Sequence, residues 1–416
     1  MNKLFFLVFL FSIEFFFAQD QSSQKSFYVN PEVLVGISSD ANTDFPERDL
    51  QTQLFLNFGW FHNPERHSWL KYLKTEKAGL SLGYTDLGNS DLLGAVFTLQ
   101  PFLEFGAFNS DRFNVHVATG MSYFTEEYNL ISNPNNRAIS TDFTWAFKLF
   151  LYYDLLKMNA LKWRLGVGYV HNSNGHTSLP NQGVNSFLIS LGLDVDSPVY
   201  NLDSQQKKKF TSNYYSLRLG YGINALTESI NQKKAVYTIS GEYGKFYNGI
   251  FKLGFGAYAR FYEMYYDYIN GNESLVQDGR EFEELKDKPF INAINFGVSG
   301  NAELILNHIG IDVQVGFNIY KPGYDLDWTL NEGWGIVPRD IPEDGGNFRL
   351  GDTDEAYFYI KKYISARMGL KYYVWNTSDY QPHNLYVGAF INSNLGQADF
   401  TEFAVGYVKQ FNFKEK

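Results

Sequence analysis

Apolar and polar residues alternate strictly along several short segments of the chain. In 309–319 one face carries Ile309, Ile311, Val313, Val315, Phe317 and Ile319, and the other carries glycine or polar residues. Segments 163–173 and 251–261 follow the same pattern. A period of two residues is that of a β-strand. Because the second face carries glycine and charge, it suits a polar lumen, and the pattern predicts a transmembrane β-barrel.

Applied to the whole chain, this alternation predicts an all-β outer-membrane barrel protein with about sixteen antiparallel strands, an even number as such barrels require. The strands expected in the first half are 27–38, 51–62, 78–86, 93–108, 112–124, 140–156, 162–173 and 184–195. Those expected in the second half are 213–223, 234–246, 250–264, 290–305, 307–320, 356–374, 384–394 and 399–413. The sequence leaves open one large barrel or an 8+8 duplication. A periplasmic β-sandwich or lipocalin-like barrel is the less favoured alternative.

The connections between these strands indicate the orientation in the membrane. If the first strand starts in the periplasm, the long polar connections 125–139, 265–289 and 321–355 all lie outside, as is usual for such barrels. Two long connections, 63–77 and 196–212, are then periplasmic and break the rule. We interpret the second as a seam between two halves of the chain, and the first as a short helix or a sign that the strand count is wrong there.

A weak internal repeat supports the seam. The segment VGYVHNSN at 167–174 aligns without gaps to VGAFINSN at 387–394, each on the penultimate predicted strand of its half. The second copy has Ile391 where the first has His171. One copy therefore keeps a polar side chain that the other replaces with an aliphatic one.

Composition places the chain in the bacterial envelope. Residues 1–18 have the basic start, apolar middle and small final residue of a secretory signal peptide. Aromatic residues make up 18% of the chain, and it contains no cysteine for a disulfide or a lipid anchor. The formal net charge of −10 argues against a nucleic-acid partner. We expect export to the outer membrane of a Gram-negative cell.

Three polar residues fall on the apolar faces of two neighbouring predicted strands. His171 and Ser173 continue the apolar face of 162–173, and Asn185 starts that of 184–195. All three are therefore expected on the outside wall, near the outer end of the barrel. Polar groups that face lipid are costly and usually mark function. The alternative is that they have already left the bilayer and lie in the headgroup zone.

The segment HNSNGHTSLPNQGVN at 171–185 resembles the active-site motif of the PagL-type lipid A 3-O-deacylases, or acyloxyacyl hydrolases. The family's His-x-Ser-Asn core corresponds to His171, Ser173 and Asn174, and its Pro-Asn-x-Gly to Pro180, Asn181 and Gly183. The resemblance implies an eight-stranded outer-membrane barrel that removes a fatty acyl chain from lipid A. It covers roughly residues 27–200. We therefore expect a deacylase-like barrel half over 19–200 and a second half, a degenerate repeat, over 201–416.

The resemblance implies ester hydrolysis by a serine nucleophile. Ser173 would attack the ester carbonyl and His171 would take the hydroxyl proton. Asn174, with the backbone near Gly175, would stabilise the oxyanion. The family has a glutamate as its third catalytic residue, where this chain has Asn185. An amide can orient the imidazole but cannot stabilise its positive charge, which predicts slow or absent activity.

Other candidate sites are weaker. His176 and Ser178 are interpreted as loop residues. The acidic segment 338–355 lacks the ligand spacing of a calcium loop, and nothing in the sequence resembles a zinc site. We expect no cofactor and no metal.

The predicted function is hydrolysis of an ester-linked acyl chain of lipid A or lipopolysaccharide. The competing hypothesis is a non-enzymatic barrel, either a porin-like channel or a scaffold. The sequence does not determine the oligomeric state.

Overall fold

The computed structural model of the chain describes residues 27–61, 75–108, 110, 112–158, 161–195, 210–331, 358–378 and 380–415. The expected signal peptide and the acidic segment 338–355 lie outside these residues, as do most of 63–77 and of 196–212. Among the described residues, no helix has the length and apolar character needed to cross a membrane.

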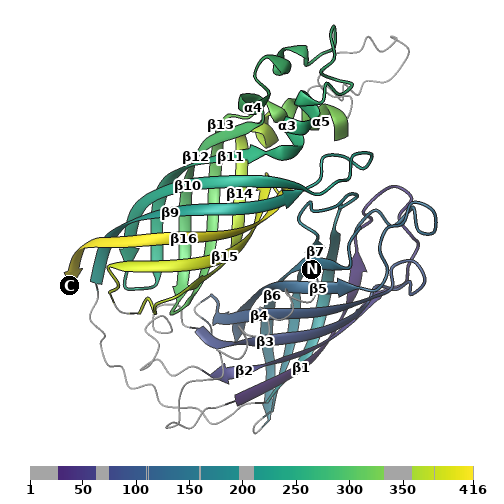
Figure 1. Cartoon of the computed structure of the whole chain (residues 1–416). Coiled ribbons are helices and arrows are strands. Elements are labelled where there is room, and N and C mark those ends of the chain that lie inside the picture. Colours follow the sequence, from purple (N-terminus) through teal and green to yellow (C-terminus); the bar gives the residue numbers. More distant parts are fainter. Residues whose placement is uncertain are drawn as a thin grey trace, which may run out of the picture.

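The described residues contain sixteen strands, arranged as two closed antiparallel barrels (Figure 1). The first barrel contains β1 (Phe27–Ser38), β2 (Gln51–Phe61), β3 (Thr75–Asp86), β4 (Ala95–Gly106), β5 (Phe113–Phe124), β6 (Phe143–Met158), β7 (Leu161–Ser173) and β8 (Val184–Val195). The second contains β9 (Phe210–Asn224), β10 (Lys234–Tyr247), β11 (Phe251–Tyr262), β12 (Ile294–Leu306), β13 (Ile309–Tyr320), β14 (Ile364–Tyr373), β15 (His383–Asn394) and β16 (Gln397–Glu415). The prediction of an all-β protein with sixteen strands is confirmed, and the strands form two eight-stranded barrels rather than one large one.

Two predicted strands include helical residues near their start. Residues 358–363 are helical, so β14 begins at Ile364 rather than at 356. The helix α4 (Pro289–Asn292) precedes β12, which begins at Ile294. In both places apolar residues of a helical turn continue the face of the strand that follows, and the alternation alone does not separate the two.

Exposure along the strands follows the predicted faces. On β13 the side chains of Val315 and Phe317 are about half exposed, whereas Asp312 and Gln314 are buried. On β11 Phe255 is exposed and Lys252 is buried. An apolar outer surface and a polar interior are what a barrel in a bilayer requires.

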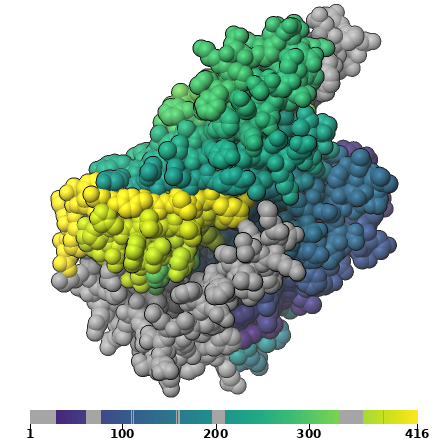
Figure 2. Space-filling view, viewed as in Figure 1, coloured from purple at the N-terminus to yellow at the C-terminus, as the bar shows by residue number. Residues whose placement is uncertain are grey.

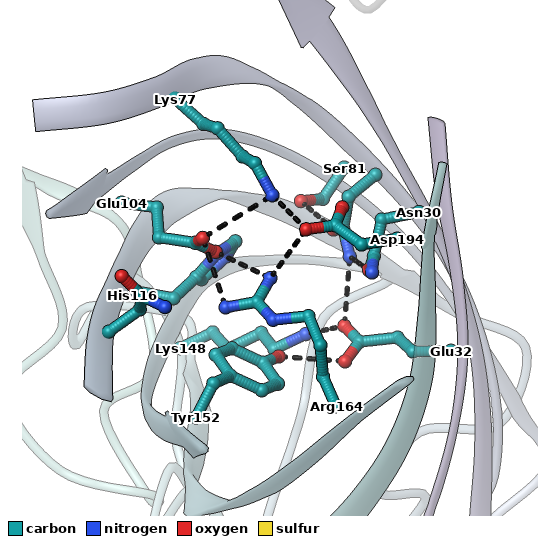
Figure 3. Close-up of polar contacts among 12 residues, drawn as sticks. Asn30, Glu32, Lys77, Ser81, Glu104, His116, Lys148, Tyr152, Arg164 and Asp194 are labelled. Carbon is teal, nitrogen blue, oxygen red and sulfur yellow. Dashed lines mark hydrogen bonds and ion pairs between the residues drawn. The ribbon is translucent and has the colours of Figure 1, made fainter. Parts of the chain in front are cut away.

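The lumen of the first barrel is filled by a network of paired charges (Figure 3). Arg164 contacts Glu104 at 3.0 Å and Asp154 at 3.1 Å. Glu32 binds Lys148 and accepts a hydrogen bond of 2.7 Å from the hydroxyl of Tyr152. Eight strands enclose a space that side chains just fill, so this barrel has a packed polar core. The structure therefore does not favour the channel alternative.

The second barrel is filled in the same way and carries short helices at one end. Inside it, Arg218 contacts Glu402 at 2.8 Å, and Lys371 contacts Asp312 at 2.6 Å. At the end where β11 and β13 finish lie α3 (Glu263–Asn270), the 3₁₀ helix η1 (Glu283–Asp287), α4 and α5 (Gly323–Asn331) (Figure 1). Of these helices, α3, η1 and α5 contribute side chains to a buried cluster that includes Tyr265. The connection 265–289, expected as a polar loop, is therefore partly helical.

The two barrels touch where the connection 174–183 of the first meets the connection 225–233 of the second. Figure 2 shows the teal surface of the second barrel against the blue surface of the first. Arg137 forms an ion pair with Glu228 across this contact. The backbone N–H of Ala225 donates to the carbonyl oxygen of His176 at 3.1 Å. The end of β7 therefore lies beside the second barrel.

Candidate active site

The predicted site lies at the end of β7 and the start of β8. These strands are paired so that His171 lies opposite Asn185, with Tyr169 opposite Phe187. These four side chains share the outward face, because they alternate with Val170 and Ser186, which are buried towards the interior. His171 and Asn185 are half-buried. Their expected position on the outside wall of the barrel agrees with this register.

Asn185 fixes the orientation of the His171 ring. The side-chain oxygen Oδ1 of Asn185 lies 2.8 Å from Nδ1 of His171, and the same oxygen accepts a hydrogen bond from the Tyr169 hydroxyl. An amide oxygen can only accept, so Nδ1 of His171 carries the proton. The other ring nitrogen, Nε2, is then left as an acceptor. This is the tautomer that a general base needs.

Ser173 is buried, with 5% of its surface exposed, and two N–H groups point at its hydroxyl oxygen. The side-chain nitrogen of Asn181 donates to Ser173 Oγ at 2.9 Å, and the backbone N–H of Gly175 donates at 3.2 Å. Trp145 of β6 is the register neighbour of Ser173. Ser173 was expected on the lipid face but is covered, because the connection after β7 folds back over the end of its own strand.

Within the part of the chain that the structure describes, no hydrogen bond joins Ser173 Oγ to the His171 ring. The two residues are separated by one position on the same face of β7, so their Cα atoms are roughly 6–7 Å apart. Contacts between a nucleophile and its base are often loose without substrate and shorten when it binds. The arrangement places the acceptor nitrogen Nε2 of His171 and the Ser173 hydroxyl on the same face of β7.

The connection 174–183 is held together by hydrogen bonds of Asn181 and Asn174. Asn181 Oδ1 accepts the backbone N–H of Asn174 at 2.9 Å, so Asn181 ties both ends of the turn together. The Asn174 side chain donates to the Ser178 carbonyl oxygen at 2.9 Å and to the Ser140 hydroxyl at 3.3 Å. It is thus engaged with the loop and does not contact Ser173 Oγ.

Gly183 allows the chain to pass close to the His171 ring. Its φ of +77° is in the left-handed region, and a Cβ atom there would lie 2.9 Å from Cε1 of His171. A larger residue would push the ring away from its position. The glycine of the motif therefore has a packing role beside the His171 ring.

The sequence analysis missed several residues that shape this site. It placed Asn181 in the motif but gave it no role, and it did not connect Tyr169 with Asn185. The signal for Asn181 was its fixed spacing from Ser173. Trp145 and the neighbouring Thr401 of β16, which share a hydrogen bond of 3.1 Å, carried no signal because they are far apart in the chain. Among the described residues, no group of three or more His, Asp or Glu side chains is suited to a metal ion.

Comparisons with known proteins match both halves of the chain. A family model described as lipid A 3-O-deacylase (PagL) matches residues 49–194, and one described as acyloxyacyl hydrolase, C-terminal domain, matches residues 208–331. No curated protein sequence matches the chain. The first match contains the motif residues 171–185, and the second begins just before the second barrel.

Similar solved structures were also found. The outer membrane enzyme PagL is 18% identical, over 40% of this chain and 99% of that one, with a TM-score of 0.27. CdiB from Acinetobacter baumannii is 8% identical, over 94% and 61% of the two chains, with a TM-score of 0.16. OprB from Pseudomonas putida is 9% identical, over 93% and 94%, with a TM-score of 0.15. The two family matches follow one another along the chain and together span most of it, and the chain belongs to the PagL lipid A 3-O-deacylase (acyloxyacyl hydrolase) family.

Proposed function

We propose that this outer-membrane lipid A deacylase works as a serine hydrolase, with Ser173 as nucleophile, His171 as general base and Asn185 as the residue that orients the base. The observation that carries the proposal is the contact of 2.8 Å between Asn185 Oδ1 and His171 Nδ1. It leaves Nε2 of the ring as a proton acceptor on the strand face that also carries Ser173. Nucleophile, base and orienting group in this order are the arrangement of a hydrolytic triad.

In the first half of the reaction Ser173 Oγ attacks the carbonyl carbon of the ester, and its proton passes to Nε2 of His171. The tetrahedral intermediate collapses when the bond to the sugar oxygen breaks, and His171 returns the proton to that oxygen. The acyl chain is then held as an ester of Ser173. Water attacks this ester with His171 again as base, and the fatty acid leaves.

The negative charge of the intermediate needs hydrogen-bond donors near Ser173. The charge develops on the carbonyl oxygen of the ester, whose carbon becomes bonded to Ser173 Oγ. We assign to this oxygen the Gly175 backbone N–H and the Asn181 side-chain nitrogen, the two donors that contact Ser173 Oγ in the substrate-free protein. Each such donor is typically worth about 3–4 kcal/mol of transition-state stabilisation. Asn174, which we also expected here, enters the proposal as the residue that holds the loop through Ser178.

The outside wall beside the site suits an acyl chain. From Asn185 the outward face of β8 continues with Phe187, Ile189 and Leu191, which are 58%, 59% and 48% exposed. A lipid whose ester lies at Ser173 can lay its apolar chain along this stripe without leaving the bilayer. The outer leaflet therefore supplies the substrate directly to the wall of the barrel.

The test is mass spectrometry of lipid A from cells that express the wild type or Ser173→Ala. We expect the wild type to remove one ester-linked acyl chain and the variant to leave lipid A intact. Heat-dependent gel mobility of both proteins controls for folding. If the folded Ser173→Ala protein deacylates lipid A like the wild type, Ser173 is not the nucleophile and the proposal is wrong.

A further inference from the structure

The second barrel holds the loop that carries the proposed site. The loop 174–183 supplies Gly175 and Asn181, whose N–H groups contact Ser173 Oγ. Other backbone atoms of the same loop bond to the second barrel. They are the carbonyl oxygens of Gly175 and His176, bound by Thr401 and Ala225, and the N–H and carbonyl of Leu179, both bound by Asn231.

Thr401 is the buried part of this contact. It lies on the outward face of β16, where Phe403 and Val405 are 38% and 57% exposed, yet Thr401 itself is only 7% exposed. The loop of the first barrel covers it. Its hydroxyl accepts from Trp145 Nε1 at 3.1 Å and donates to the Gly175 carbonyl oxygen at 3.3 Å. Thr401 thus links the strand beside Ser173 to the loop that follows it.

Gly175 is held closely by this contact. Its φ is +66°, and a Cβ atom at this position would lie 2.2 Å from the Thr401 hydroxyl. The peptide on one side of Gly175 donates to Ser173 Oγ, and the peptide on the other side accepts from Thr401. If the Gly175 carbonyl group shifts away from Thr401, the Gly175 N–H therefore turns away from Ser173 Oγ.

Asn231 holds the far part of the loop. Its side-chain oxygen accepts the Leu179 N–H at 2.9 Å, and its side-chain nitrogen donates to the Leu179 carbonyl oxygen at 2.6 Å. Leu179 precedes Pro180 and Asn181, so this two-way contact positions the residue before the Asn181 turn. Asn181 in turn contacts Ser173.

The register of the second barrel relates Thr401 to the first site. Ile391 of the repeat aligns with His171, and Ile391 pairs with Thr401 just as His171 pairs with Asn185. Thr401 therefore occupies, in the second barrel, the position that Asn185 occupies in the first. The second barrel has Ile391 at the position of His171, and its wall at Thr401 contacts the loop of the first barrel.

We propose that the second barrel is part of the deacylase, and that Thr401 and Asn231 are positioning residues that hold the loop 174–183 in the geometry needed for oxyanion stabilisation at Ser173. The proposal rests on the function proposed above. The hydrogen bonds of the Thr401 and Asn231 side chains go to Trp145 and to the loop 174–183, not to the outward stripe of β8 where the acyl chain is expected. Their loss should therefore lower kcat and leave KM for lipid A unchanged.

The first experiment compares Thr401→Val and Thr401→Ser in the full-length protein, with purified lipid A in detergent micelles. We expect Thr401→Val to lower kcat by about 10- to 100-fold with unchanged KM, because misplacement by 1 Å can cost about that much. Thr401→Ser keeps the hydroxyl and should restore most of the rate. Rates are expressed per folded molecule, from heat-dependent gel mobility.

The matched control is Thr377→Val. The Thr377 hydroxyl also bonds to backbone carbonyl oxygens, those of Gly249 and Asn307, but in the connection between β14 and β15, away from the site. This variant should keep the wild-type kcat per folded molecule. If Thr401→Val loses no more activity than Thr377→Val, the proposal is overturned.

Asn231→Ala is the second test, with Asn384→Ala as its control. Asn384 makes the same two-way contact, to the backbone of Trp375, away from the contact between the barrels. We expect Asn231→Ala to lower kcat and Asn384→Ala to leave kcat unchanged. Hydrogen exchange of the Asn174 and Gly175 amides should be faster in Thr401→Val and in Asn231→Ala. If the amide exchange of Thr401→Val and Asn231→Ala matches that of the wild type, the positioning proposal is overturned, whatever the substrate is. If Ser173→Ala is active, only the function proposed above is overturned.

Discussion

His171 and Asn185 face each other across β7 and β8, with Nδ1 of the imidazole 2.8 Å from the amide oxygen. The amide orients the ring but carries no charge to stabilise the imidazolium that forms, in the proposed mechanism, when Ser173 loses its proton. Asn185→Glu should therefore raise kcat for lipid A deacylation. The gain should be smaller than the factor of about 10⁴ that a buried carboxylate provides in serine proteases, because the dielectric near headgroups is higher.

The companion variant Asn185→Ala should lower kcat, since it frees the ring and leaves the Tyr169 hydroxyl without its acceptor. Both variants are measured against the wild type on purified lipid A in micelles. If both match the wild type while Ser173→Ala is inactive, another group orients the base.

Asn181 donates to Ser173 Oγ, so Asn181→Ala should remove one of the donors to the developing oxyanion. We expect kcat to fall by up to about 10²- to 10³-fold, the usual cost of one such donor. Asn181→Asp keeps the shape and the acceptor for the Asn174 N–H but loses the donor. An Asp variant as active as the wild type would show that Asn181 only orders the loop.

Gly183 lies against the His171 ring, and Gly183→Ala places a methyl group 2.9 Å from Cε1 in a left-handed backbone conformation. The strain costs about 1 kcal/mol, and the ring must move. We expect a lower kcat with a barrel that still runs as a folded species on gels. Gly279→Ala has a similar φ of +74° with open space around it and serves as the control. Equal losses in both variants would assign the effect to backbone strain.

We predict that His176 makes the stability of the protein sensitive to pH. Burial lowers the pKa of His176 below its ordinary value, against the opposing effect of Asp399. Asp399 and Asp327 line the same small cavity as His176. In the unfolded chain the ring takes up its proton near pH 6.5. The stability linked to this residue is therefore complete above about pH 6.5 and falls as the pH drops towards the folded pKa, by at most about 1.4 kcal/mol per pH unit.

Thermal unfolding between pH 8 and pH 5 tests this prediction. The wild type should lose more stability than His176→Gln as the pH falls below 6.5, because glutamine does not titrate there. Parallel curves for the two proteins would contradict the prediction.

Glu104 is buried in the first barrel with Arg164 and Lys77 (Figure 3). Glu104→Gln leaves these positive charges without part of their compensation and should cost about 3–5 kcal/mol of stability, as for other buried ion pairs. The site lies on the outer wall, so activity per folded molecule should be unchanged. Asp278→Asn breaks an exposed pair with Lys286 and should leave the unfolding temperature as it is. A loss of activity in folded Glu104→Gln would link the lumen to the reaction.

The strands and their two faces could be predicted from the sequence, because alternation with a period of two reports directly on which side chains meet lipid. β1 and β8 begin and end where the pattern predicts. The positions of His171 and Asn185 on one face follow from the same alternation and from a register set by a short connection. The motif resemblance was sufficient to predict the family's reaction, whereas Ser173 as its nucleophile stays a prediction. Whether the second half is a degenerate repeat stays a prediction.

Closure of the strands into two barrels was decided by pairing between strands that are far apart in the chain, as in the contacts of β1 with β8 and of β9 with β16. Local periodicity is identical for one barrel or two. The contacts of Thr401 with Trp145 and Gly175 join residues more than 200 positions apart. No spacing rule reaches over such a distance, because the packing of the two barrels brings these residues together. The sequence by itself determined the strands, the polar face and the candidate nucleophile, and only the tertiary structure decided what surrounds Ser173.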